Sequence, residues 1–335
     1  MRGTAEHVAT VAGSAVVLGE VWLGTGASLG PGVVVRSHDR AVSIGNHTAV
    51  RENTTVWGDA RHPVRIGQCT VVGHRVTVTG AHVGHLCEIG TGAILLPGSW
   101  LGDGCIVAEG TLIPPGMVVP AGTVVAGRPP HTVRSATEHD RRMSRAHPAG
   151  LTEHHYQRLA ARPVSGATMR QLYAYDGRRP VVHETAVLFD SAEVTGDVVI
   201  GPNSVLAAGV KIAADGGPVR LGRNVQVLEN AVLHLLAGEE LVVEDDVVIG
   251  PGALVHGGRI GAHTVVESGA IVCDGARIGP GSLVRAGACV RQRSEFGPLA
   301  VLDGIPARVT TILDVRPSRP PWAFTPTSLA AVTKY

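Results

Sequence analysis

Aromatic side chains are scarce in this sequence of 335 residues: Phe, Trp and Tyr together make up 3% of it, although apolar residues make up 44%. A core of this composition cannot be built on large rings, so Val, Ile, Leu and Ala must fill it. The 44 glycines suit tight corners, where positive φ angles are needed. Together these features predict a narrow prism of short, stacked elements instead of an ordinary globular core.

An excess of charge is also missing. The sequence has 29 basic and 28 acidic residues, which leave a net charge of +1, and both signs are interspersed. This balance provides no electrostatic basis for binding nucleic acid or a membrane surface. No apolar run is long enough to span a bilayer, and the N-terminal MRGTAEHVAT does not have the features of a signal peptide. We therefore expect a cytoplasmic protein with a small-molecule substrate and neither nucleic acid nor a membrane as a partner.

Cysteines are few, and their five positions include no C-x-x-C pair, which argues against a cysteine-based zinc site. Cys69, Cys87 and Cys105 are evenly spaced, each three hexapeptides after the one before. We expect them to stack along one edge of the prism as small buried apolar groups.

A repeat of six residues dominates what is present. Aliphatic residues keep this step at Val243, Ile249 and Val255, and after one stride of five the same step continues. The continuation comprises Ile260, Val266, Val272, Ile278, Val284 and Val290. A period of six fits neither an amphipathic helix nor a single alternating strand. It predicts a solenoid of short parallel strands, each followed by a turn.

Domain boundaries follow from where the repeat stops. We expect a first solenoid over residues 1–134, a linker over 135–179, a second solenoid over 180–315 and a Pro-rich tail over 316–335. The polar segment 135–162 lacks the six-residue step and predicts one or two helices, broken at Pro148. The tail is expected to be extended against a neighbour, or disordered.

The two solenoids are copies of each other. The offset that relates Gly45 to Gly222 is the same as the offset that relates Gly127 to Gly304. Because no gap intervenes, positions of the two halves can be compared one to one across this block. The sequence therefore indicates an internal duplication.

Both halves resemble the gamma-class carbonic anhydrases. The matching stretches of the second half are GDVVIGPNSVLAAGV, DGGPVRLGRNVQVLENAVLH, LVVEDDVVIGPGALVHGGRIG and GIPARV, and those of the first are VVVRSHDRAVSIG, VRIGQCTVVGHRVTVTG and IGTGAILLPG. The resemblance implies an all-β fold of two tandem left-handed parallel β-helix domains, joined here by the helical linker. Hexapeptide acyltransferases share the solenoid motif, so the specificity lies in the histidines.

In the family that the chain resembles, three histidines at a subunit interface hold each metal ion, two from one subunit and one from its neighbour. Residues one coil apart can share a metal on one face, which matches His234 and His256. The position contributed by the neighbour matches His74. In the first half, Trp57 and Thr79 stand at the positions of His234 and His256. In the second half, Pro251 stands at the position of His74. The resemblance thus implies one composite three-histidine site for Zn²⁺ or Fe²⁺, formed between a first and a second half.

A second pair of positions favours the same arrangement. The family pattern has an Arg and an Asp that pair across this interface. The first half keeps Arg36 but has His38 at the acidic position, whereas the second half keeps Asp215 but has Ala213 at the basic one. Arg36 and Asp215 would form the remaining ion pair. The interface forms either within one chain or between two, and we expect a homo-oligomer.

The resemblance also implies a reaction. Three imidazoles with an open coordination position activate water, whose pKa falls to about 7 on zinc, for attack on CO₂. Arg51 replaces a glutamine of the family, so an anionic, carboxylated metabolite that is hydrated or hydrolysed is a second possibility. Glu52 is a candidate for orienting these groups. Glu239, with Glu240 beside it, is either a proton shuttle or part of a solvated turn.

Two other functions stay open. The chain could be a hexapeptide-repeat acyltransferase that uses acyl-CoA, although the sequence shows no distinct signature for that cofactor. It could also be a non-catalytic scaffold, a decayed duplicate in which the three histidines remain by accident. In that case His74 would bond a carbonyl at its corner, and His234 and His256 would be exposed polar residues.

Overall fold

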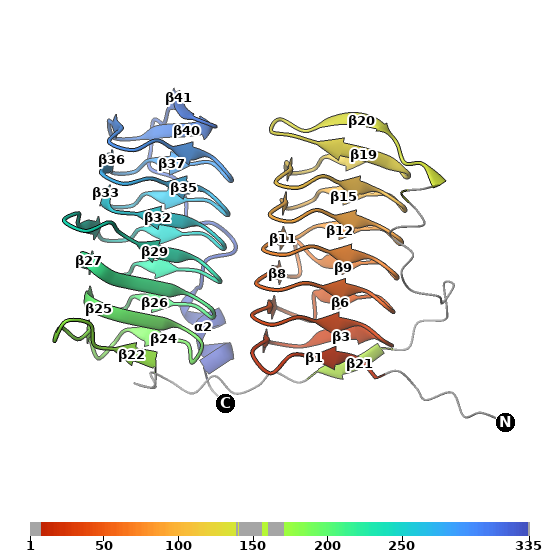
Figure 1. The fold of residues 1–335 in the computed structure, drawn as a ribbon, viewed down its shortest axis with the longest axis horizontal. Coiled ribbons are helices and arrows are strands. Elements are labelled where there is room, and N and C mark those ends of the chain that lie inside the picture. Colours follow the sequence, from red (N-terminus) through yellow and green to blue (C-terminus); the bar gives the residue numbers. More distant parts are fainter. Residues whose placement is uncertain (1–7, 139, 141–155, 160–170, 334–335) are drawn as a thin grey trace. The chain divides into compact units, whose positions relative to one another are not determined.

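The computed structural model describes residues 8–138, 140, 156–159 and 171–333. The chain divides into two compact units, residues 1–162 (unit 1) and residues 163–335 (unit 2), and each is described by itself. In both units short parallel strands follow one another around three faces of a prism, and successive coils stack along its axis (Figure 1). The predicted all-β solenoid with tandem units is confirmed.

Three sheets form the faces of unit 1. The first contains β1 (Thr10–Val11), β4 (Ser28–Leu29), β7 (Ala49–Val50), β10 (Val71–Val72), β13 (Glu88–Ile89), β16 (Ile106–Val107), β19 (Thr123–Ala126) and β20 (His131–Ser135). The second contains β2 (Val16–Leu18), β5 (Val34–Ser37), β8 (Thr55–Gly58), β11 (Thr77–Thr79), β14 (Ile94–Leu95) and β17 (Leu112–Ile113). The third contains β3 (Val21–Gly24), β6 (Val42–Ile44), β9 (Val64–Ile66), β12 (His82–Val83), β15 (Trp100–Leu101), β18 (Val118–Val119) and β21 (Tyr156–Leu159).

Unit 2 repeats this plan, but two long strands bend around a corner and join two of its faces into one sheet. That sheet contains β22 (Leu172–Tyr173), β23 (Val181–Val182), β25 (Glu193–Ile200), β27 (Lys211–Leu221), β29 (Val232–His234), β30 (Leu241–Val243), β32 (Leu254–His256), β33 (Gly258–Ile260), β35 (Ile271–Val272), β36 (Ala276–Ile278), β38 (Cys289–Val290) and β39 (Glu295–Phe296). The remaining face contains β24 (Val187–Leu188), β26 (Val205–Leu206), β28 (Gln226–Val227), β31 (Val248–Ile249), β34 (Val265–Val266), β37 (Leu283–Val284), β40 (Ala300–Gly304) and β41 (Ala307–Ile312).

Small aliphatic side chains fill the prisms. In unit 1, Val35, Val56 and Val78 are in register on successive coils and have no exposed surface. Side chains alternate between the two faces of a strand, so Trp57, which follows Val56, points away from the interior. The core cluster of unit 1 comprises Val, Leu, Ile, Ala and Cys residues among those described. Each fully buried Val contributes roughly 1.5–3 kcal/mol, so the scarcity of aromatic residues does not deprive the fold of a core.

The structure corrects the predicted stack of three cysteines. Val71 is in register with Glu88, so this coil is one position shorter than three hexapeptides, and Cys87 lies beside Thr70 instead of Cys69. Cys87 and Cys105 are neighbours because the next coil has the expected full length. All three thiols are buried and free, as predicted. A single missing position is enough to shift the register, and only two of the three stack.

The linker contains strands that the sequence did not predict. Residues 156–159, which were expected in a helix, form strand β21, which pairs antiparallel with β3. This added strand satisfies backbone groups at an edge that would otherwise be unpaired. Within the segment of the predicted helices, residues 139, 141–155 and 160–162 lie outside the described residues.

The tail packs on unit 2 instead of being free or extended along a neighbour. Phe324 is buried, its ring lies 5.5 Å from that of Phe189, and its backbone N–H and C=O both bond the side-chain amide of Gln226, at 2.8 and 2.9 Å. A short helix, α2 (Pro326–Thr333), follows. The sequence prediction missed these contacts because they join residues 98 positions apart.

Candidate functional site

His234 and His256 occupy the same position on successive coils of unit 2. They end strands β29 and β32, which lie on successive coils (Figure 1), and the two residues are in direct register. Their rings lie edge to face, with centroids 5.5 Å apart at an angle of 90°. Both side chains point outward because Leu233 and Val255, which precede them, are buried in the prism and side chains alternate along a strand. The structure therefore brings together the two predicted ligands of the same face.

A carboxylate flanks each of these imidazoles. The Nε2 atom of His234 lies 3.7 Å from Oδ1 of Asp215, and Nδ1 of His256 lies 3.8 Å from Oδ1 of Asp274. Asp215 comes from the preceding coil, where Ala213 is in register with His234. Carboxylates at this range favour a protonated nitrogen on the side facing them and leave the other ring nitrogen for a ligand.

His74 lies in the turn between β10 and β11 of unit 1, and its side chain is 54% exposed. Its Nδ1 atom lies 2.6 Å from Oε2 of Glu52. Glu52 occupies the same turn of the preceding coil, since its backbone carbonyl accepts a hydrogen bond from the amide of Arg75 at 3.0 Å. The structure places the predicted orienting residue Glu52 against the imidazole of His74, and its role stays a prediction.

Arg51 is at the same corner as His74. Its backbone N–H donates to the carbonyl of Val72 at 2.9 Å, which places it beside Gly73, the residue before His74. The side chain is exposed. A cation at this corner is available to an anionic ligand near the imidazole.

Glu239 belongs to a loop, residues 235–240, that leaves the prism directly after His234. A Cβ on Gly217 would collide with the carbonyl oxygen of Glu239, and a Cβ on Gly257 would lie 3.2 Å from its Cβ. The loop therefore needs glycine at position 217, whereas a side chain at position 257 would force only a small shift. The Glu239 side chain is half-buried and extends toward Gly275, beyond the coil of His256.

The matching corner of unit 1 is closed. Trp57 and Thr79 are in register at the positions of His234 and His256, and both are buried. The Thr79 hydroxyl donates to the carbonyl of Leu95 at 3.0 Å. The guanidinium of Arg36 lies 5.7 Å from the centre of the Trp57 ring, within the range of a cation–π contact. An indole and an alcohol in these positions supply no metal ligand of the kind that Zn²⁺ prefers.

The two members of the predicted interface ion pair each have a contact within their own unit. Arg36 is 1% exposed and lies over Trp57, while Asp215 lies beside His234. The pairing of Arg36 with Asp215 stays a prediction.

Within either unit, the described side chains supply only part of the ligands that a histidine-bound metal needs. Among the residues that the structure describes, no three His, Cys, Asp or Glu side chains lie close enough to hold a metal ion. Unit 2 contributes two neighbouring imidazoles, each with a carboxylate 3.7 or 3.8 Å away, and carboxylates beside the ring are usual for metal-binding histidines. Within unit 2 the two imidazoles leave such a site one ligand short, and the contribution of His74 stays a prediction.

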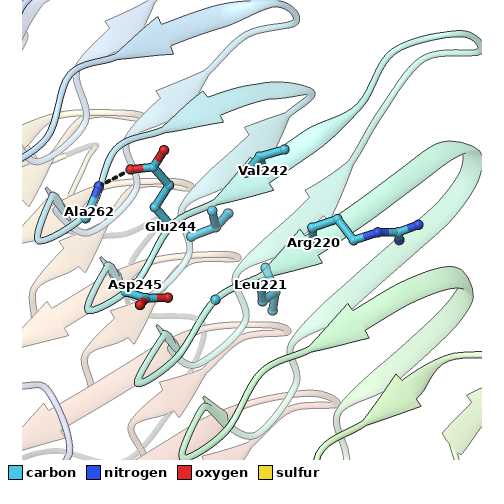
Figure 2. Close-up of a pocket in the computed structure, with 8 residues that line it drawn as sticks. Arg220, Leu221, Val242, Glu244, Asp245 and Ala262 are labelled. Atoms are coloured by element: carbon cyan, nitrogen blue, oxygen red, sulfur yellow. Dashed lines mark hydrogen bonds between the residues drawn. The ribbon is translucent and has the colours of Figure 1, made fainter.

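A separate surface hollow of about 380 Å³ lies at the next corner of unit 2 (Figure 2). Figure 2 shows the carboxylates of Glu244 and Asp245 on one side of it and Arg220 on the other. Glu244 accepts a hydrogen bond from the amide of Ala262 at 2.9 Å, and Arg220 pairs with Asp197 at 2.8 Å. Arg220 is the one cation among the described residues of the lining and is already paired, so the hollow attracts a polyanion such as a nucleotide cofactor only weakly.

The sequence prediction missed Asp274. A signal was present, because the constant offset between the two halves places Pro97 at the corresponding position of unit 1. The acidic residue therefore occurs in the half that has the paired histidines and is absent from the half that does not.

Among the residues described, no helix has the length and hydropathy that a bilayer span requires.

No protein-family model matches the sequence. Among curated proteins, the chain is 30% identical over 103 residues to a carbonic anhydrase of Geobacillus kaustophilus, a match that covers 31% of this chain and 57% of that protein. It is 38% identical over 85 residues to the uncharacterized transferase YtoA of Bacillus subtilis, a match that covers 25% of this chain and 50% of YtoA. The chain thus spans about half the length of either relative.

A longer match is to the carnitine operon protein CaiE of Citrobacter koseri, with 35% identity over 137 residues that cover 41% of this chain and 70% of CaiE. This match accompanies a parallel β-solenoid in each of the two units and a six-residue step in the sequence. The chain therefore belongs to the hexapeptide-repeat family of left-handed β-helix proteins that includes gamma-class carbonic anhydrase-like proteins, and it is a tandem duplicate within that family.

Proposed function

We propose that the chain is a metal-dependent enzyme of the gamma-carbonic-anhydrase type, with one composite site built from His74 of a first unit and His234 and His256 of a second. The observation that carries this proposal is the register of His234 with His256, with rings 5.5 Å apart. The identity to a named carbonic anhydrase supports it. The ion would be Zn²⁺ or Fe²⁺, since imidazole suits both.

A bound ion of this kind would supply Lewis acidity and a water that ionises near neutral pH. The chain's own residues would do the rest. His234 and His256 hold one side of the site, and His74 completes it from the other unit. Glu52 lies 2.6 Å from Nδ1 of His74. Its carboxylate keeps the ring proton of neutral His74 on Nδ1 and leaves Nε2 free to bind the metal.

Arg51 and Glu239 would act on the substrate and the proton. Arg51, beside His74, attracts bicarbonate or the carboxylate of a metabolite, because a guanidinium binds planar carboxylates bidentately. Glu239, on the loop after His234, accepts the proton that activated water releases. The reaction is accordingly the hydration of CO₂, or the hydration or hydrolysis of a carboxylated metabolite. Arg36 and Asp215 would pair where the two units meet.

An acyl transfer is the second candidate, because the chain is 38% identical to a protein named as a transferase. It would need a site for acyl-CoA, whose phosphates are anionic. The hollow of unit 2 has carboxylates of Glu244 and Asp245 in its lining, which disfavours that cofactor there. The acyl transfer would proceed without a metal, so the two functions differ in one measurable property.

Metal analysis of the purified protein tests the proposal. The protein is produced with zinc or with iron supplied, and elemental analysis should find about one ion per chain. His234→Ala and His256→Ala should each lose it, and His74→Ala should lose it as well. His183→Ala, at an exposed turn of unit 2, is the matched control and should keep it. Metal-free wild-type protein that binds acetyl-CoA would contradict the proposal and favour acyl transfer.

A further inference from the structure

Asp274 is held at a fixed place beside His256. The amide of Ala276 donates to the carbonyl of Cys273 at 3.2 Å, which closes a turn around Asp274. The Asp274 carbonyl accepts a hydrogen bond from the amide of Arg293 at 2.9 Å. Since Val272 is in register with Val255, this turn begins at the coil position next to His256. The backbone thus aims the carboxylate at the imidazole.

Two polar atoms face each other at this point. The Nδ1 atom of His256 and Oδ1 of Asp274 are both shielded from solvent, and neither has a hydrogen-bond partner among the described residues. They lie 3.8 Å apart, and the Asp274 side chain is 14% exposed. A buried polar atom without a partner destabilises a fold. A movement of about 1 Å would bring these two atoms within hydrogen-bond distance and so stabilise the fold.

On the basis of the proposed metal site, we propose that Asp274 is a positioning residue that fixes the ring orientation and the tautomer of His256 for metal binding. A bond from Nδ1–H to the carboxylate leaves the lone pair on Nε2. The same contact restricts rotation of the ring, so less freedom is lost when a metal binds. Carboxylates behind ligand histidines act in this way in metalloproteins generally.

The duplicate supports this assignment independently. The constant offset between the halves aligns His256 with Thr79 and Asp274 with Pro97. Thr79 is buried and bonds a backbone carbonyl, so it has no ring to orient. A carboxylate and an imidazole therefore occur together in one copy and are absent together from the other.

Zinc affinity separates a positioning role from a merely structural one. The wild type, Asp274→Ala and Asp274→Asn are compared by competition with a chromophoric chelator and by the visible spectrum of the cobalt-loaded protein. Asp274→Ala should bind zinc about 10–100-fold more weakly and show an altered cobalt spectrum. Asp274→Asn keeps the side chain's size and an acceptor, so it should lose less affinity and stay folded even where alanine does not.

Asp246→Ala is the matched control, because Oδ2 of Asp246 lies 3.5 Å from Nδ1 of His263 at another corner of the same unit. It should keep the zinc affinity and cobalt spectrum of the wild type. Wild-type affinity and spectrum in both Asp274 variants would overturn the positioning role alone. Failure of the wild type itself to bind zinc would remove the metal site, and the role of Asp274 with it.

Discussion

Glu52 and His74 face each other across two successive coils of unit 1, with Oε2 of the carboxyl group 2.6 Å from Nδ1 of the imidazole. They stand in consecutive turns of the same corner, so the parallel register of the solenoid sets their separation. The counterparts in unit 2 are Glu229 and Pro251. The glutamate is thus present in both copies, whereas an imidazole that it can orient is present in one.

Replacement of Glu52 should weaken metal binding at the proposed site. Glu52→Ala frees the His74 ring to rotate and to change tautomer, so we expect a loss of about 10–100-fold in zinc affinity, measured by chelator competition. Glu52→Gln keeps an acceptor and should lose less. Glu109→Gln, an exposed glutamate of the same unit, should bind zinc as the wild type does. Equal affinity in all four proteins would show that the contact has no role in binding.

Mixing two variants that each lack part of the proposed metal site tests how that site is assembled. His74→Ala lacks the ligand of unit 1, and a double variant, His234→Ala with His256→Ala, lacks those of unit 2. If the site forms between chains, co-refolded mixtures should regain bound zinc, because some interfaces unite an intact unit 1 with an intact unit 2. If it forms within one chain, the mixture should stay metal-free. Zinc in either variant alone would contradict the composite site.

Arg51→Leu introduces the residue that unit 2 has at the corresponding position, Leu228. A hydrogen-bonded charged group contributes about 1.5–3 kcal/mol, so a small carboxylate such as acetate should bind the zinc-loaded variant at least about tenfold more weakly. Calorimetric titration measures this directly. Arg308→Leu, an exposed arginine on β41, is the control for loss of positive charge. Unchanged acetate affinity would remove Arg51 from the substrate site.

The sequence predicted those features of the fold that depend on a local, repeated pattern. The six-residue step identified the solenoid, and the constant offset between the halves, together with the resemblance, predicted that His234 and His256 would be in register. It did not predict Asp274 or the tail on Gln226, since both depend on side chains that meet across coils without a repeated pattern. The predicted stack of three cysteines failed for a related reason: one coil is a single position short, which moves Cys87 out of line with Cys69, and composition contains no trace of such a shift.

Glu267 offers a test of how burial affects stability away from the proposed site. Burial raises the pKa of its carboxyl group and Asp303 adds to this, although the amide of Ala286 and the Arg285 guanidinium oppose it. The unfolded chain therefore releases the Glu267 proton at lower pH than the folded chain does. By linkage, the stability that the neutral Glu267 side chain contributes is fully present below the ordinary pKa of a glutamate. This contribution is lost as pH rises through the pKa of Glu267 in the folded state.

Glu267→Gln removes this ionisation while its carbonyl can still accept the bond that the Ala286 amide gives to Oε2, at 2.9 Å. We expect the variant to melt at a higher temperature than the wild type at pH 7, and at the same temperature at pH 4, where both side chains are neutral. Scanning calorimetry at the two pH values measures the difference. Glu295→Gln is the control, because the Glu295 side chain is 75% exposed and should give no pH-dependent gap. A Glu267→Gln protein that melts below the wild type at pH 7 would mean that the ion pair with Arg285, 3.7 Å away, outweighs the cost of burying the charge.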